Sequence, residues 1–136
     1  MGVKGNLKMT PWTSDELTKI GTAEELQIAS LRQDGTLRKP VTIWVVRLGN
    51  DLFVRSVRGR SGAWFHGTQV RLQGHIQAGG LDKDVTFVDA TPDINDQIDA
   101  AYRTKYRRYS SSIVSTIVTP EARSSTIKLV PRSTGS

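Results

Sequence analysis

A basic, glycine-rich segment offers the clearest chemistry in this sequence. It reads Arg55-Ser56-Val57-Arg58-Gly59-Arg60-Ser61-Gly62, and neither a helix nor a strand is expected there. Glycine lets backbone N–H groups approach an anion, and guanidinium groups bind phosphate oxygens in pairs. Arg38 and Lys39 are expected on a neighbouring strand end, near the same edge. The segment therefore predicts an anion site, with a merely solvated basic turn as the alternative.

The two histidines, His66 and His75, limit the acid–base chemistry that is available. His66 follows Trp64-Phe65 in a predicted loop and is the better candidate for a general base. His75 is predicted on the outward face of an alternating strand, where a solvated or interface role is favoured. The chain lacks a GxSxG motif, cysteine, and the HxH, HExxH and DxDxDG spacings, so we expect neither a serine triad nor a metal site.

Tyrosines and basic residues alternate between Tyr102 and Tyr109, which could stack on bases and grip phosphates. The alternative is a helix whose tyrosines pack inward and whose bases complement its carboxyl end. We favour the second interpretation, so a nucleic-acid partner is not expected.

Length and charge narrow the class of protein. A chain of 136 residues is expected to form one domain, with flexible ends at residues 1–9 and 133–136. The net charge of +6 predicts an anionic partner, which could be a nucleic acid, a phosphorylated cofactor or an acidic metabolite. No apolar run is long enough to span a membrane and the start resembles no secretion signal, so a cytoplasmic location is expected.

The first half of the chain predicts a helix followed by hairpins. Thr13 to Glu16 has capping-box spacing, which predicts a short helix over residues 14–20. Alternation begins at Leu26, and Asp34-Gly35 predicts a hairpin turn. Residues 41–46 are apolar on both faces and predict one central strand with Trp44 buried. Gly49-Asn50 then turns the chain into a strand over residues 51–57.

The second half continues the antiparallel pattern and adds one long helix. Residues 70–78 alternate, with Val70, Leu72, Gly74, Ile76 and Ala78 expected to point inward. Gly79-Gly80 ends that strand, and residues 84–90 form the next. A helix is predicted near residues 93–108, residues 113–118 fit either a strand or a helix, and residues 126–130 form a last strand. The pattern predicts a mostly β protein, an antiparallel barrel or strongly curled sheet with helices outside.

Several segments together resemble a small bacterial family, domain of unknown function 2255. They are Lys39-Pro40-Val41-Thr42-Ile43-Trp44-Val45-Val46, Leu52-Phe53-Val54-Arg55-Ser56-Val57-Arg58-Gly59, Ala63-Trp64-Phe65, Gly74-His75-Ile76-Gln77-Ala78-Gly79-Gly80, Ile98-Asp99-Ala100-Ala101-Tyr102-Arg103-Thr104-Lys105-Tyr106 and Thr126-Ile127-Lys128-Leu129-Val130-Pro131-Arg132. The resemblance covers nearly the whole chain.

That family is similar to the split β-barrel proteins that bind flavin mononucleotide (FMN) or a deazaflavin, such as pyridoxamine phosphate oxidase and the deazaflavin-dependent nitroreductases. Ser56, Gly59, Trp64 and Phe65 match the segment that binds the cofactor phosphate in the deazaflavin branch. The sequence departs from that pattern at Ala63, where the branch has proline, and over residues 66–69. The resemblance implies a split antiparallel β-barrel, a homodimer and a phosphorylated cofactor or other small anionic ligand.

Three functions follow from these readings. The first is a flavin- or deazaflavin-dependent oxidoreductase in which Trp64 flanks the ring system and the phosphate is held by Arg38, Lys39, Arg55, Ser56, Arg58, Arg60 and Ser61. The second is a cofactor-free protein on the same barrel, either a small-ligand binder or an acid–base enzyme that uses His66. The third is a nucleic-acid binder. We favour the first.

Overall fold

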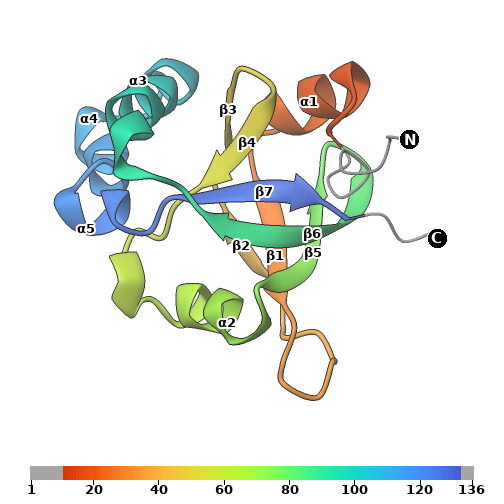
Figure 1. Cartoon of the computed structure of the whole chain (residues 1–136). Helices are drawn as coiled ribbons and strands as arrows, with labels where there is room; N and C mark the ends of the chain where they lie inside the picture. The colour runs from red at the N-terminus through yellow and green to blue at the C-terminus, as the bar shows by residue number, and fades with distance from the viewer. Residues whose placement is uncertain (1–10, 133–136) are drawn as a thin grey trace.

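The computed structural model describes residues 11–132, and its centre is a curled antiparallel sheet of seven strands (Figure 1). The strands run in the order β2-β1-β5-β6-β7-β4-β3. Their bounds are β1 (Leu26–Ser30), β2 (Val41–Ile43), β3 (Val46–Leu48), β4 (Asp51–Val54), β5 (Gln73–Ala78), β6 (Leu81–Asp89) and β7 (Ile127–Pro131). The ends predicted to be flexible, residues 1–9 and 133–136, lie outside the described residues.

Helices cover the sheet from several sides. They are α1 (Ser14–Gly21), α2 (Ala63–Arg71), α3 (Asn95–Lys105), α4 (Ser111–Val114) and α5 (Pro120–Arg123), with single 3₁₀ turns η2 (Gly59–Ser61), η3 (Pro92–Ile94) and η4 (Ser115–Ile117). Figure 1 shows α3, α4 and α5 gathered on one side, and α3 contacts β3 while α2 contacts β1. Within residues 11–132, every helix is too short or too polar to cross a bilayer.

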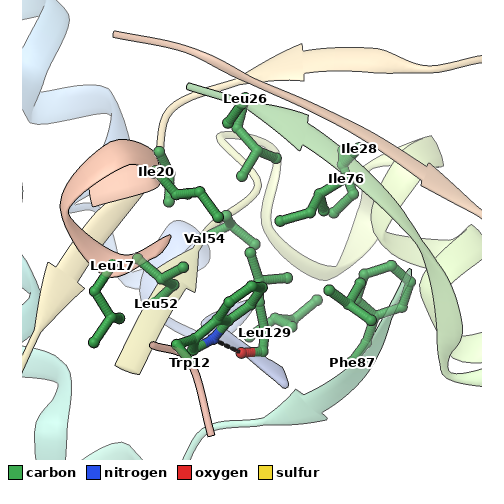
Figure 2. Close-up of a cluster of buried hydrophobic side chains, with 14 of the residues drawn as sticks. Trp12, Leu17, Ile20, Leu26, Ile28, Leu52, Val54, Ile76, Phe87 and Leu129 are labelled. Atoms are coloured by element: carbon green, nitrogen blue, oxygen red, sulfur yellow. Dashed lines mark hydrogen bonds between the residues drawn. The ribbon is translucent and has the colours of Figure 1, made fainter. Parts of the chain in front are cut away.

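The inside of the curl holds the larger hydrophobic core (Figure 2). Leu17 and Ile20 of α1 close one end of it, because the two residues lie on one face of that helix. Trp12 is buried beside them, and its indole N–H donates to the carbonyl of Leu129 at 2.9 Å. This bond satisfies the one polar atom of the indole inside an apolar core.

Strand β4 separates this core from a second one. Side chains alternate across a strand, so Leu52 and Val54 enter the inner core while Phe53 points to the helices. Phe53 packs there with Val46 of β3 and with buried residues of α3, α4 and η4, namely Ile98, Tyr102, Val114 and Ile117. The helices are therefore fixed to the outer face of β3 and β4.

Many sequence predictions are confirmed. The mostly β class with an antiparallel curled sheet is present, and Thr13 caps α1 in a capping box with Glu16. Asp34-Gly35 lies in the turn between the paired strands β1 and β2, Gly49-Asn50 joins β3 to β4, and Gly79-Gly80 joins β5 to β6.

The prediction of one central strand over residues 41–46 is wrong. The run contains two short strands, β2 and the start of β3, which lie at opposite edges of the sheet. Between them, the Val45 backbone bonds to side chains of the α3 end instead of to a strand, through Tyr106 and Lys105. Trp44 is therefore only partly buried. The run is apolar because it passes between the helices and a pocket described below, and not because it lies in the middle of the sheet.

The prediction for residues 64–78 is half wrong. Residues 63–71 form helix α2 rather than a loop and a strand start, and Leu72 ends the helix in a left-handed conformation with φ 60°. Val70 and Leu72 are consequently exposed, whereas Gly74, Ile76 and Ala78 of β5 are buried as predicted. Gly62 precedes α2 and has no side chain to cap it, so no capping residue marks the start of this helix in the sequence. Of the ambiguous residues 113–118, all but Val118 are helical, in α4 and η4.

Tyr106 joins the helices to the sheet through its hydroxyl. That hydroxyl donates to the Glu24 carbonyl at 2.9 Å and accepts from the Val45 N–H at 3.2 Å. Tyr102, one helical turn earlier, is equally buried, but its hydroxyl has no hydrogen-bond partner among residues 11–132. Burial raises the pKa of both phenols, so both stay neutral at physiological pH.

These two tyrosines give a matched pair of substitutions. Tyr106→Phe should lower the free energy of unfolding by about 1–3 kcal/mol, because it leaves the buried Val45 N–H and the partly buried Glu24 carbonyl without this partner. Tyr102→Phe should be neutral or stabilising, because it removes an unpaired buried hydroxyl. Urea denaturation of both variants measures the difference, and equal losses would contradict the assigned bonding.

Candidate functional site

A pocket of about 530 Å³ lies between β2, the start of α2 and the turn η4. We call it the tryptophan pocket; it is lined by Val41, Thr42, Ile43, Trp44, Arg55, Ser56, Val57, Arg58, Gly62, Ala63, Trp64, Ile113, Thr116 and Ile117. Three of these, Val41, Val57 and Ile113, are large hydrophobic side chains that remain exposed. A mostly apolar hollow with a few polar groups is typical of a site for a planar organic ligand.

Trp44 forms a rigid part of this pocket. Its ring stacks on Tyr106 with the centroids 3.8 Å apart and the planes 4° from parallel. The Lys105 ammonium lies beside the same tyrosine and donates to the Val45 carbonyl at 2.7 Å. Burial lowers the pKa of Lys105 to about 8. The indole is therefore held by packing from behind and presents its remaining surface to the pocket.

A second, smaller pocket of about 250 Å³ adjoins the first. We call it the basic pocket, and it is lined by Ile28, Ser30, Arg32, Arg38, Lys39, Val41, Ala63, Trp64 and Thr68. The two pockets share Val41, Ala63 and Trp64. Three of the lining side chains carry positive charge, and the buried Nε of Arg38 has no hydrogen-bond partner among residues 11–132. A buried guanidinium N–H without a partner favours an anionic ligand at this point.

The first turn of α2 and Arg58 add positive potential to the tryptophan pocket. Gly62, the N-cap residue, has no side chain to bond the free N–H groups of the turn, and Gly62, Ala63 and Trp64 all line the pocket. Arg58 is exposed at the same pocket, and no ion pair within residues 11–132 involves it. The first turn of α2 and the Arg58 guanidinium would both stabilise negative charge on a ligand in this pocket.

Arg55 is used differently from the prediction. It is 1% exposed, and all of its N–H donors are taken: Nε by Thr126 at 2.8 Å, one terminal nitrogen by Asp99 at 2.5 Å and Ile117 at 3.1 Å, the other by two Asn95 oxygens at 3.2 Å. No donor is left for a phosphate. The prediction that Arg55 holds the phosphate is therefore corrected. Arg55 borders the tryptophan pocket, but its side chain links separate segments of the fold.

Other members of the predicted phosphate site also have structural roles. Gly59 has φ 65°, and a Cβ there would lie 2.5 Å from the Glu121 carbonyl oxygen, so this glycine lets η2 pack against α5. Arg60 donates to the Ser124 carbonyl at 3.0 Å and covers the ring of Phe65, which is buried in the inner core. Ser61 donates to the Arg58 carbonyl at 2.8 Å. Gly59, Arg60, Ser61 and Phe65 line neither pocket.

Besides Arg55, five predicted residues line the two pockets: Arg38, Lys39, Ser56, Arg58 and Trp64. Ser56 is buried, and its backbone exchanges bonds with the Ser125 hydroxyl. The binding roles of the five residues remain predictions. Residues missed from the sequence include Arg32, Trp44, Thr68 and Ile113. Only Arg32 had a usable signal, because a turn at Asp34-Gly35 brings it close to Arg38.

Neither histidine lies in these pockets. The His66 side chain is exposed on α2 and lines neither pocket, which leaves its predicted role as a general base without support. His75 lies between two carboxylates, with Nδ1 2.9 Å from Asp84 and Nε2 3.1 Å from Asp82. Partial burial lowers the pKa of His75, but the hydrogen bonds and charges of the two carboxylates outweigh this effect, so the pKa is raised.

Within residues 11–132, no three metal-binding side chains form a cluster.

A family of uncharacterized proteins conserved in bacteria, domain of unknown function 2255, matches residues 16–129. The chain belongs to this family. The match spans the whole sheet except the end of β7, together with both pockets. It confirms the family predicted from the sequence. Among curated proteins, none is detectably similar to the chain.

Solved structures with the same fold include proteins named for flavin-type cofactors. An F420 reductase aligns with a TM-score of 0.55 and 13% identity, over 88% of this chain and 93% of its own. A FAD-binding protein from Mesorhizobium loti aligns with a TM-score of 0.50 and 13% identity, over 90% and 91%. A protein of unknown function from Agrobacterium tumefaciens gives a TM-score of 0.60 and 10% identity, over 90% of this chain and 54% of its own. At these identities the likeness establishes the fold.

The structural role of Arg55 can be tested through its partner. Asp99→Ala should lower the free energy of unfolding by about 3–5 kcal/mol, because it leaves a buried guanidinium without its counter-charge. Asp96→Ala is the matched control on the same helix, since among residues 11–132 that exposed carboxylate pairs with Arg123 alone and should contribute less than about 1 kcal/mol. Urea denaturation in the absence of any ligand gives both values, and an Asp99→Ala variant as stable as the control would contradict the cross-link.

Proposed function

We propose that this protein binds a flavin or deazaflavin across the two adjoining pockets and acts as an oxidoreductase. The observation that carries the proposal is their junction at Trp64, where an apolar pocket meets a positively charged one. A flavin nucleotide has the same two-part character, with a planar ring system at one end and a phosphate at the other. The ring would lie against Trp64 in the tryptophan pocket, and Arg38 and Lys39 would hold the phosphate.

The residues present fit such a ligand. The tryptophan pocket alone, at about 530 Å³, lies within the range of roughly 300–1,000 Å³ usual for small-molecule sites. In the basic pocket, a Cβ at position 67 would lie 3.0 Å from Arg38 Nε, so Gly67 leaves room for the guanidinium against α2. The unpartnered Nε then gives the pocket a buried donor for a phosphate oxygen.

The chain's own groups would also influence the redox chemistry. A bound flavin or deazaflavin supplies hydride transfer, and the protein contributes orientation and electrostatics. Arg58 and the uncapped first turn of α2 place positive potential beside the ring position. That potential favours the negative charge a ring gains on reduction. The exposed mouth formed by Val41, Val57 and Ile113 leaves an apolar approach for a substrate.

The structural neighbours support the same class of function. Two of them are named an F420 reductase and a FAD-binding protein, and F420 is a deazaflavin coenzyme. Fold likeness alone does not transfer an activity, so the pockets carry the argument. The cofactor-free alternative based on His66 gains no support, because that side chain lines neither pocket.

Titration with FMN and with F420, followed by tryptophan fluorescence and calorimetry, tests the proposal. We expect saturable binding of one of them. Arg38→Gln should weaken it at least about tenfold by removing charge-assisted bonds to the phosphate, and Trp64→Ala should weaken it by removing the ring contact. Trp64→Phe keeps an aromatic face and should retain most of the affinity.

Arg47→Ala is the matched control. It removes the same charge from β3, where Arg47 is exposed and its Nε bonds only the Gly49 carbonyl. Equal losses in Arg38→Gln and Arg47→Ala would mean that overall charge, and not the basic pocket, holds the ligand. No saturable binding of either cofactor would overturn the proposal and leave a cofactor-free function.

A further inference from the structure

A third pocket shares no lining residue with the two pockets above. Its volume is about 380 Å³, and it lies between the end of α3 and the α4–η4 segment. We call it the α3–α4 pocket, lined by Arg103, Arg107, Tyr109, Ser111, Val114, Ser115 and Val118. Its lining includes two of the three arginines of the segment from Tyr102 to Tyr109, the segment whose alternation of tyrosines and basic residues suggested a phosphate contact.

The charge of this pocket is uncompensated. Within residues 11–132, neither Arg103 nor Arg107 takes part in an ion pair, although Arg55, Arg60, Arg108 and Arg123 all do. No carboxylate side chain lines the pocket, and residues 1–10 and 133–136 contain no aspartate or glutamate. Glu24, which bonds the Tyr109 hydroxyl, is already paired with Arg108.

We propose that the α3–α4 pocket is a second binding site and that it takes a small phosphate monoester. Two guanidinium groups four residues apart match the oxygens of a phosphate, and Ser111 and Ser115 lie in the same lining. The Ser115 hydroxyl donates to the Ser112 carbonyl at 2.9 Å, so it can still accept a bond but has no proton left to donate. Arg107 donates one hydrogen bond to the Thr104 carbonyl, which orients its guanidinium and leaves the other N–H donors available. The apolar remainder, Val114, Val118 and the Tyr109 ring, fits a carbon skeleton and makes the pocket larger than a bare phosphate needs.

The new site shares a wall with the tryptophan pocket. Along the α4–η4 segment, Ile113, Thr116 and Ile117 line the tryptophan pocket, whereas Val114, Ser115 and Val118 line the α3–α4 pocket. The Tyr109 ring also lies 5.2 Å from Trp44, centroid to centroid. A ligand in one pocket therefore contacts the same helical segment as a ligand in the other, yet the sites use different arginines.

Calorimetric titration of the full chain with phenyl phosphate and with inorganic phosphate, at low salt, tests the proposal. We expect saturable binding of phenyl phosphate that is tighter than that of phosphate, because only the ester fills the apolar part. Arg103→Ala and Arg107→Ala should each weaken it at least about tenfold. Both side chains are exposed, so these variants should fold, as urea denaturation can verify.

Two variants separate this site from the other positive groups. Arg47→Ala removes the same charge elsewhere, and Arg38→Gln disables the basic pocket; both should leave the Arg103-dependent binding unchanged. Absence of saturable binding, or equal weakening by Arg47→Ala, would overturn the proposal. Loss in Arg38→Gln with retention in Arg103→Ala would also overturn it, because the phosphate would then occupy the basic pocket. None of these outcomes depends on whether a flavin binds.

Discussion

The buried ion pair between Arg55 and Asp99 is the constraint on which the rest of the structure depends. A charged pair is expensive to remove from water, and the arrangement is stable only if every donor finds a partner. Here the partners come from α3 (Asn95 and Asp99), from η4 (Ile117), and from the residue before β7 (Thr126). The side chain of Arg123 adds to the cluster, with its Nε 3.2 Å from Asp99 but not aligned for a hydrogen bond. Satisfying one side chain at the end of β4 thus fixes three separate segments.

That cross-link has a direct consequence for the pockets. The carbonyl of Ile117 accepts from Arg55, and Ile117 is also part of the tryptophan pocket. Together with Thr116 it forms the wall opposite α2. The same helical segment forms one side of the α3–α4 pocket, so both hollows depend on where Arg55 holds η4. An arginine that looks like a ligand-binding group in the sequence instead shapes the space in which a ligand could lie.

The second organising feature is the crossing of the chain from β2 to β3. These strands lie at opposite edges of the sheet, yet only Trp44 and Val45 separate them in sequence. The link is held by Tyr106 and Lys105 in place of a neighbouring strand. Because the link runs past the open side of the curl, its tryptophan is left beside the pocket. The same feature that misled the strand prediction therefore contributes the pocket's rigid aromatic surface.

The sequence revealed the parts of the fold that are set by local rules. The Asp34-Gly35 turn, the capping box at Thr13 and the alternation over Gly74, Ile76 and Ala78 depend on neighbours within a few residues. Helix α2 was missed because Gly62 offers no capping side chain, and residues 70–78 alternate straight through the helix end. The site was only partly predictable for a different reason. Nothing local indicates that Arg55 meets Asp99, 44 residues away, whereas Arg38, Lys39, Arg58 and Trp64 do reach the pockets.

A crystal structure of the protein with FMN or F420 at saturating concentration tests the central claim most directly. We predict the ring system against Trp64 in the tryptophan pocket and the phosphate within hydrogen-bonding distance of Arg38, with the Arg55–Asp99 pair unchanged. A phosphate bound by Arg55, or a cofactor located outside the two adjoining pockets, would contradict the claim.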